Sequence, residues 1–168
     1  VASVNAVNWI DGLDGLVCGI SAISFVSIIF LNPLQIHIIL VALIGGCLAF
    51  LKYNLRPASI ILGDGGSYLL GFNLASLSLI NSYTNYSTST LKISNILIPL
   101  FILFLPLFDM VRVIIIRLLN NKLPFYPDRQ HLHHLLIDKK WMHENILIFY
   151  FTSNFFVCLA SIYFKNIN

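Results

Sequence analysis

Charged side chains are scarce in this sequence. Asp, Glu, Lys and Arg together make up 10% of its 168 residues, whereas 58% of the residues are hydrophobic. A soluble domain carries about 25% charged residues, so this composition cannot cover the surface of a soluble globule. Several apolar runs reach bilayer-spanning length and predict a membrane protein. A basic patch interleaved with exposed aromatic residues is also missing, so we expect no nucleic-acid partner.

Cysteine is rare, and no signal peptide is visible. Cys18, Cys47 and Cys158 lie far apart inside apolar runs, so we expect buried free thiols and no disulfide framework. The chain begins at Val1, and polar residues follow at once, without a charged segment and apolar core. We therefore expect the sequence to be part of a longer protein.

Five apolar stretches alternate with polar loops. Because a backbone in hydrocarbon must satisfy its own hydrogen bonds, we expect each stretch to form a membrane-spanning helix. The first three are shorter than the roughly 20 residues of an isolated span, but flanking Gly, Ser and Asn can extend them. The predicted fold is an all-α polytopic membrane protein with about five transmembrane helices. The stretches are residues 16–31, 36–51, 68–80, 93–119 and 146–164.

Lysine and arginine are distributed unevenly between the loops. Five spans place residues 1–15, 52–67 and 120–145 on one side, and residues 32–35, 81–92 and 165–168 on the other. Eight of the ten basic residues lie at the first side, namely Lys52, Arg56, Arg112, Arg117, Lys122, Arg129, Lys139 and Lys140. Only Lys92 and Lys165 lie at the other side. The positive-inside rule therefore predicts that the first side is cytoplasmic.

The unusual polar clusters all fall on that predicted cytoplasmic side. The first contains Asn5, Asn8, Asp11 and Asp14, a spacing that keeps side chains on one slowly drifting face of a helix. Two carboxylates and two amides can hold a cation, its waters and a nucleotide. The alternative is a solvated helix start with Asp as a cap. The neighbouring glycines and apolar residues favour the binding site.

The second cluster contains Asn54 and the segment Gly63-Asp64-Gly65-Gly66-Ser67. Its glycines allow a ligand to approach the backbone, and a helix N-terminus attracts phosphate. Asp64 could then anchor a metal that bridges phosphate oxygens. The alternative is an N-cap turn, since Asp and Ser are both good caps.

The third cluster is Asp128-Arg129-Gln130-His131-Leu132-His133-His134, preceded by Pro127. Three histidines in four residues raise the possibility of a zinc site, but no cysteine lies near and two of the histidines are adjacent. Anion recognition is the favoured interpretation, because Arg129 offers a planar fork of donors for phosphate. A basic loop in contact with lipid headgroups is a third alternative.

Asp109 lies inside the fourth apolar stretch, where a carboxylate is costly and usually paired. Arg112 follows three residues later, at a spacing that allows an ion pair within one helix. A structural pair and a direct role in substrate binding both remain open.

In this order, the three clusters resemble the polyprenyl-phosphate N-acetylhexosamine-1-phosphate transferases of glycosyltransferase family 4. The segments that carry the resemblance are the Asn/Asp-rich residues 5–16, the Gly-Asp segment 62–67, the histidine segment 127–134 and the helix segment 105–109. The histidine segment is closer to the branch that starts O-antigen, common-antigen or teichoic-acid polymers. The phospho-MurNAc-pentapeptide transferases of peptidoglycan synthesis are the alternative branch.

The resemblance implies transfer of a sugar phosphate from a UDP-N-acetylhexosamine to undecaprenyl or another polyprenyl phosphate, with release of UMP. It implies a bacterial inner-membrane enzyme with cytoplasmic active-site loops that uses Mg²⁺, or Mn²⁺ in its place. Asp64 would be the metal ligand with help from Asn8, and Asp64, Asp11 and Asp14 would be the catalytic residues. The implied substrate-binding residues are Asn5, Asn8, Asp14, Asn54, Arg129, His131, His133 and His134.

Members of this family have about ten or eleven spans and an early cytoplasmic Asp-Asp motif. This sequence contains no Asp-Asp pair. We therefore expect residues 1–168 to be one membrane-embedded catalytic segment that matches the C-terminal half, inactive by itself. A transporter is a rival interpretation, but it predicts carboxylates and broken helices near mid-membrane, where only Asp109 fits. A structural membrane subunit predicts featureless loops on both faces.

Overall fold

The computed structural model describes residues 1–32, 34–84, 93–126 and 128–167, and this part of the chain is helical without strands. The all-α prediction is therefore confirmed for the described residues. Residues 85–92 of the predicted external loop, including Lys92, lie outside the described residues. Pro127 of the third cluster also lies outside them. The helices are α1 Ala2–Trp9, α2 Leu16–Leu31, the short 3-10 helix η1 Leu34–Ile36, α3 His37–Asn54, α4 Gly63–Thr84, α5 Ile93–Ile102, α6 Phe104–Leu119, α7 Leu132–Asp138 and α8 His143–Ile167.

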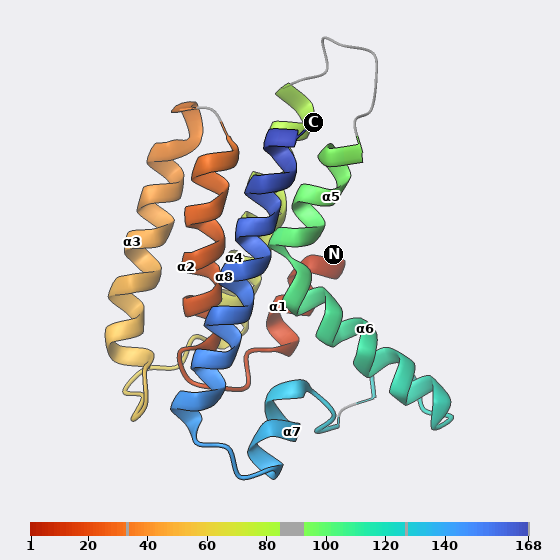
Figure 1. Cartoon of the computed structure of the whole chain (residues 1–168). Helices are drawn as coiled ribbons and strands as arrows, with labels where there is room; N and C mark the ends of the chain where they lie inside the picture. The colour runs from red at the N-terminus through yellow and green to blue at the C-terminus, as the bar shows by residue number, and fades with distance from the viewer. Residues whose placement is uncertain (33, 85–92, 127, 168) are drawn as a thin grey trace.

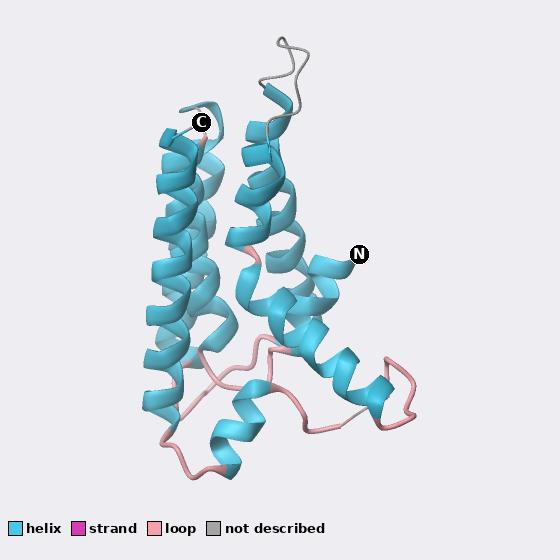
Figure 2. Cartoon of the chain, turned by 45° about the vertical axis from the view of Figure 1, so that its right-hand side comes forward, coloured by secondary structure: helices cyan, strands magenta, loops and turns pink. Residues whose placement is uncertain are grey.

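The helices α2, α3, α4, α5 and α8 form an elongated bundle, from which α6 departs at an angle (Figure 1). In the bundle α2 packs against α3 and α8, and α4 packs against α1 and α5. The turn between α1 and α2, the α3–α4 loop and α7 all lie at the lower end of the bundle (Figures 1 and 2). These three segments therefore lie at one end of the bundle, and that this end forms a cytoplasmic face stays a prediction.

Two helical segments are long and apolar enough to cross a bilayer by length and composition: Leu34–Asn54 and His143–Lys165. The apolar helix α2 has 16 residues and is shorter than such a span. As expected, α4 extends beyond its apolar stretch, through the Gly and Ser residues before it and into the polar residues after it. The arrangement of five spans stays a prediction.

The fourth apolar stretch is not one helix, as the sequence predicted, but two. It breaks at Leu103 between α5 and α6. Pro106 has no N–H, so it cannot bond to the carbonyl of Ile102 four residues earlier, and its ring crowds that carbonyl. The Ser24 hydroxyl from α2 donates to this freed oxygen at 3.5 Å. The break directs α6 away from the bundle and toward α1 and the site.

Polar groups hold the helix interfaces at defined positions. In α8 the Asn154 amide donates to Ile20 O and Ser24 Oγ of α2, each at 3.0 Å. Hydrogen bonds between small polar side chains are a common link between membrane helices. A Cβ at Gly71 of α4 would lie 3.0 Å from Val4 Cα, so the missing side chain lets α1 pack closely on α4. The three cysteines are buried and free, as predicted.

Candidate active site

Asn8 connects α1 to the start of α4. Its amide nitrogen donates to Asp64 Oδ1 and to Ser67 Oγ, both at 2.9 Å. The Ser67 hydroxyl also donates to the carbonyl of Asp64 at 3.1 Å, which closes the first turn of α4. The Asn/Asp-rich segment and the Gly-Asp segment, 56 residues apart in sequence, therefore form one polar surface.

The two carboxylates of the first cluster do not continue the helix that carries its asparagines. Asn5 and Asn8 lie on α1, which ends at Trp9, whereas Asp11 and Asp14 lie in the turn before α2. The expectation of one common helix face is therefore wrong. The Gly12 N–H bonds to Ile10 O at 2.8 Å, and Gly15 has a φ of 81°, a conformation that favours glycine. The turn places Asp11 beside Asp64 instead of along α1.

Three carboxylates gather at this surface. Burial, the charge of Asp64 and then that of Asp14 raise the pKa of Asp11 from 3.8 to about 6. Such mutual repulsion would be relieved by a cation or by protonation. Within the described ranges, no three His, Cys, Asp or Glu side chains converge as a ready ligand shell. Mg²⁺ needs no such shell, because it is usually held by one or two carboxylates and keeps several waters.

Asp11→Asn is expected to stabilise the metal-free full-length protein at pH 8 by about 1–2 kcal/mol, after allowance for solvent screening. The raised pKa means that the folded state binds the Asp11 proton more tightly than the unfolded state. The stabilisation that proton binding at Asp11 gives the folded wild type is complete below pH 4 and is lost as the pH rises through 6. The uncharged amide of the Asp11→Asn variant does not titrate, so the variant has no such loss. Thermal melting in EDTA at pH 4 and pH 8 measures the difference.

The matched control for this prediction is Asp138→Asn, because Asp138 is exposed and lies outside the acidic cluster. Added Mg²⁺ should narrow the gap between wild type and Asp11→Asn at pH 8, since a bound cation offsets the repulsion. Equal melting temperatures of the two proteins at pH 8 in EDTA would contradict the prediction.

Asn54 joins two backbone segments. Its side-chain oxygen accepts from Gly15 N–H at 2.9 Å, and its nitrogen donates to Ile60 O at 2.9 Å. The side chain is 5% exposed. Both ends of the amide are thus used to hold the α1–α2 turn against the α3–α4 loop. Its predicted contact with a nucleoside stays a prediction, and the visible contacts are those of a positioning residue.

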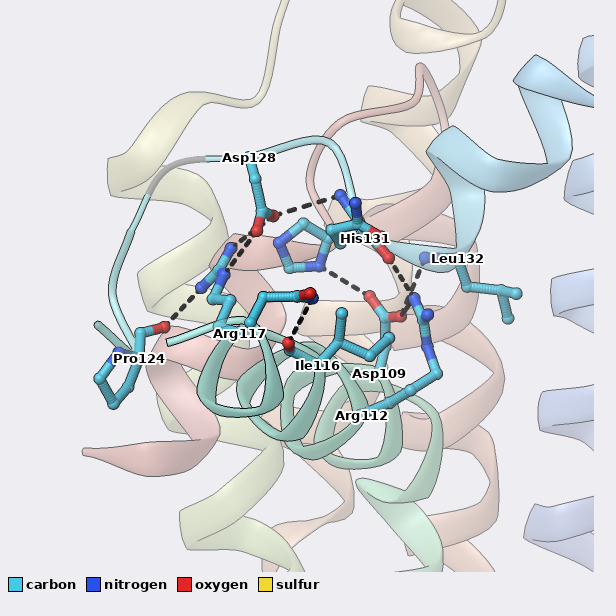
Figure 3. A network of polar contacts seen from close by, with 10 residues as sticks. Asp109, Arg112, Ile116, Arg117, Pro124, Asp128, His131 and Leu132 are labelled. Atoms are coloured by element: carbon cyan, nitrogen blue, oxygen red, sulfur yellow. Dashed lines mark hydrogen bonds and ion pairs between the residues drawn. The ribbon is translucent and has the colours of Figure 1, made fainter. Parts of the chain in front are cut away.

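Asp109 is the centre of a polar network between α6 and the histidine segment (Figure 3). Its carboxylate, 1% exposed, accepts hydrogen bonds from Arg112 Nη2 at 2.8 Å, His131 Nδ1 at 2.8 Å and Leu132 N–H at 2.9 Å. Because an ionised carboxylate can only accept, His131 carries a proton on Nδ1. Arg112 also donates to Gln130 O. The predicted Asp109–Arg112 pair is confirmed, and the same carboxylate fixes the tautomer and orientation of His131.

A second ion pair holds the loop between α6 and α7. Arg117 Nε and Nη2 donate to Asp128 Oδ2 and Oδ1 at 3.0 and 2.9 Å, and Arg117 Nη1 donates to Pro124 O (Figure 3). The Arg117 guanidinium also lies over the Trp9 ring, 5.0 Å from its centroid. Trp9 further touches His131 edge to face at 5.8 Å. These contacts fasten the histidine segment to the end of α1.

The three histidine rings lie against one another: His133 stacks on His131, and His134 is tilted by 48° to His133. The ring centroids of His131 and His133 are 5.8 Å apart, and those of His133 and His134 are 4.2 Å apart. Burial, then the charges of His134 and His131, lower the pKa of His133 to about 4. Burial is also the largest cause that lowers the pKa of His134. His133 is therefore neutral at physiological pH, and the described residues provide no three-ligand group for zinc.

His133 also touches the Asn/Asp-rich segment. A Cβ placed on Gly12 would lie only 2.3 Å from His133 Nε2, so the ring packs directly on the bare backbone of Gly12. This contact joins the first and third clusters, which are more than 100 residues apart in the sequence. Arg129 is different: it lies on the outer surface, 70% exposed, with Asp138 at 3.8 Å. Its predicted anion contact stays a prediction.

Several residues of this site carried no clear signal in the sequence. Arg117 was visible only as a charge, and Asp128 and Gly12 were visible as members of the polar segments but not as the contacts that join them. His143, at the start of α8, bonds through Nε2 to Asp14 O at 3.0 Å and lay outside every motif. Such partners are distant in the sequence and become apparent only when the elements pack together.

Known proteins with similar sequences were found over much of the chain. The family model "Glycosyl transferase family 4" matches residues 1–82. A Bacillus subtilis protein named "Probable undecaprenyl-phosphate N-acetylglucosaminyl 1-phosphate transferase" is 35% identical over 123 residues, which cover 73% of this chain and 33% of that protein. A Mycobacterium leprae protein named "Decaprenyl-phosphate N-acetylglucosaminephosphotransferase" is 33% identical over 118 residues, 66% of this chain and 29% of that protein.

An Escherichia coli protein named "Undecaprenyl-phosphate alpha-N-acetylglucosaminyl 1-phosphate transferase" is 36% identical over 100 residues, which cover 57% of this chain and 26% of that protein. The chain thus spans about a third, or less, of the length of these relatives. The family-model match includes both the Asn/Asp-rich and the Gly-Asp segments, which meet at Asn8 and Asp64. The chain belongs to glycosyl transferase family 4.

Proposed function

We propose that this chain supplies part of the active site of a membrane enzyme that moves an N-acetylhexosamine 1-phosphate from a UDP-sugar to a polyprenyl phosphate. The observation that carries the proposal is the contact of His133 with Gly12, which brings the acidic cluster and the histidine segment together. A pyrophosphate donor needs both chemistries at one place: a cation site and neutral or positive hydrogen-bond donors. The names of the relatives agree with a polyprenyl phosphate acceptor and an N-acetylglucosamine group.

The proposed reaction is a phosphoryl transfer. An oxygen of the lipid phosphate attacks the β-phosphorus of the UDP-sugar, and the bond from that phosphorus to the bridging oxygen breaks. UMP leaves with the bridging oxygen, and a polyprenyl pyrophosphate sugar remains. The protein contributes mainly positioning and stabilisation of negative charge in such a step.

Asp64, helped by Asn8, fits the role of holding Mg²⁺ or Mn²⁺, because its carboxylate is exposed at the acidic surface and Asn8 fixes its orientation. When bound, this cation would neutralise charge on the pyrophosphate. Asp11 and Asp14 would meet the nucleotide and the waters around the cation, with Asn5 and Asn8 beside them on α1. His131, His133 and His134 would donate to the pyrophosphate and sugar, and Arg129 would join them from the rim.

We further propose that the site faces the cytoplasm of a bacterium, and that the protein acts in the branch that starts O-antigen, common-antigen or teichoic-acid polymers. The excess of Lys and Arg at the end of the bundle that carries the site supports the cytoplasmic orientation. The undecaprenyl and decaprenyl relatives support a lipid acceptor in the same membrane.

The full-length protein, purified in detergent and treated with EDTA, tests the proposal. With UDP-N-acetylglucosamine or another UDP-N-acetylhexosamine, undecaprenyl phosphate and Mg²⁺, it should release UMP and form a lipid-soluble sugar pyrophosphate in equal amounts. Zn²⁺ should not replace Mg²⁺. If UDP-MurNAc-pentapeptide is the only donor that is used, the result would favour the peptidoglycan branch. Failure to release UMP with any of these donors would overturn the proposal.

A further inference from the structure

Unpaired polar atoms in the interior gather at one place. In the described part of the chain, seven buried side-chain nitrogen or oxygen atoms have no hydrogen-bond partner. Two of them belong to Ser21 and Asn32, on or next to α2. The other five are Arg112 Nε, both ring nitrogens of His133, His134 Nδ1 and the phenol oxygen of Tyr150. Buried polar groups are normally paired, so five orphans in one neighbourhood indicate a partner that binds there.

Tyr150 enters this neighbourhood from α8, an element that contributes no residue to the predicted site. Its side chain is 1% exposed, its phenol oxygen lies near the backbone N–H of His133, and it is within the electrostatic influence of Asp109 and Arg112. The N–H of His133 can donate to the phenol oxygen, but the hydroxyl proton has no acceptor. Most neighbours of Tyr150 along α8 are apolar. Packing alone would be served equally well by phenylalanine.

The five orphan atoms include more obligate donors than acceptors. Arg112 Nε can only donate, the phenol donates readily, and neutral His133 offers one donor and one acceptor. A set of donors beside a guanidinium fits an oxyanion such as a phosphate group. A buried water, the alternative occupant, would need acceptors as well as donors around it.

These atoms are closed to solvent in the present arrangement. The His133 ring rests on Gly12, and neither of its nitrogens makes a hydrogen bond. The short helix α7 is held to α6 through the bonds of Asp109 to His131 and Leu132. The His133 ring is held by packing alone, so it can shift on Gly12 without breaking a hydrogen bond.

We propose that Tyr150 is a further substrate-binding residue, whose hydroxyl donates to a phosphate oxygen of the substrate next to Arg112 and His133. The inference rests on the proposed transferase function and deepens it, because it adds a buried residue of α8 to those that bind the substrate, whereas His143 of the same helix contacts only the backbone of Asp14. It explains why a buried hydroxyl is kept without an acceptor for its proton in the ligand-free chain.

The test is Tyr150→Phe in the full-length protein, with Tyr163→Phe as the matched control, since Tyr163 lies on the same helix and is 67% exposed. We expect Tyr150→Phe to lower kcat/KM by about tenfold to a hundredfold, the effect of one charge-assisted hydrogen bond. The melting temperature of the ligand-free variant should stay the same or rise, because an unpaired buried hydroxyl is removed. The control should change neither quantity.

An unchanged kcat/KM in Tyr150→Phe would overturn the inference. A lower ligand-free melting temperature with normal kcat/KM would do so as well, and would assign the hydroxyl to a buried water. Melting curves with inorganic pyrophosphate distinguish a failure of the Tyr150 inference from a failure of the proposed function. Pyrophosphate should raise the melting temperature of wild type more than that of Tyr150→Phe, even if no tested donor is turned over. If pyrophosphate raises the melting temperatures of both proteins equally, the role of Tyr150 is overturned and the proposed transferase function is not.

Discussion

Asp64→Asn in the full-length protein is expected to lower turnover by about a thousandfold or more, while the protein still inserts into the membrane. An amide lacks the charge that holds a hard cation, and a metal contributes several kcal/mol of charge stabilisation to phosphoryl transfer. The fold should survive, because the amide oxygen of Asn can still accept the hydrogen bond that Asn8 gives to Asp64 Oδ1. Turnover measured over a range of Mg²⁺ concentrations checks the prediction.

Glu144→Gln is the matched control, because Glu144 is an exposed carboxylate in the first turn of α8. It loses the same charge without touching the acidic surface, so its turnover should stay near that of wild type. Near-normal activity of Asp64→Asn would remove Asp64 from the metal-binding role. A loss that high Mg²⁺ concentrations repair would instead show that the variant weakens cation binding without abolishing the chemistry.

Asp109→Ala is expected to destabilise the full-length protein by about 3–5 kcal/mol and to remove most of its activity. The carboxylate is 1% exposed and has three donors, so its loss leaves Arg112 without its ion pair and the start of α7 without its acceptor. Asp138→Ala removes an exposed carboxylate 3.8 Å from Arg129, and an exposed pair contributes little. The melting temperatures of the two variants in detergent provide the comparison.

Two substitutions of His131 separate stability from chemistry at this place. The amide nitrogen of His131→Asn sits near the position of Nδ1 and can still donate to Asp109, whereas that of His131→Gln reaches the position of Nε2. We expect His131→Asn to melt close to wild type but to lose about tenfold to a hundredfold in kcat/KM. The Gln variant should be the less stable of the two. A fully active His131→Asn would show that His131 only connects α7 to α6.

The sequence determined the class of fold and the location of its polar clusters. Apolar runs separated by loops predict helices, because a hydrocarbon environment leaves the backbone no other way to pair its polar groups, and the described chain is helical. Alternation of spans placed the loops that carry the polar clusters at one end, and in Figure 1 the α1–α2 turn, the α3–α4 loop and α7 all lie at the lower end of the bundle. The ion pair of Asp109 with Arg112 was also visible, because both residues lie one helical turn apart.

Local irregularities were harder to foresee. The sequence contains Pro106 in an apolar run, but such a proline can bend a helix slightly or break it. The break at Leu103 became stable because Ser24 of another helix meets the freed carbonyl of Ile102. Likewise, the three-residue spacing of Asn5, Asn8, Asp11 and Asp14 fits a helix, but α1 ends at Trp9 and a tight turn follows.

Tertiary structure alone decided which distant groups became partners. The contact of His133 with Gly12 depends on how α6 and α7 pack at the end of α1. The bonds of Asn54 to Gly15 and Ile60 depend on how the α3–α4 loop meets the α1–α2 turn. The position of Tyr150 near the backbone of His133 depends on how α8 packs against α7. Nothing in local propensity or hydropathy encodes such contacts, because they arise from the packing of whole elements. A tyrosine in an apolar helix is ordinary in sequence. It becomes a candidate ligand of the substrate only when its buried hydroxyl is found without an acceptor, near the polar network of Asp109.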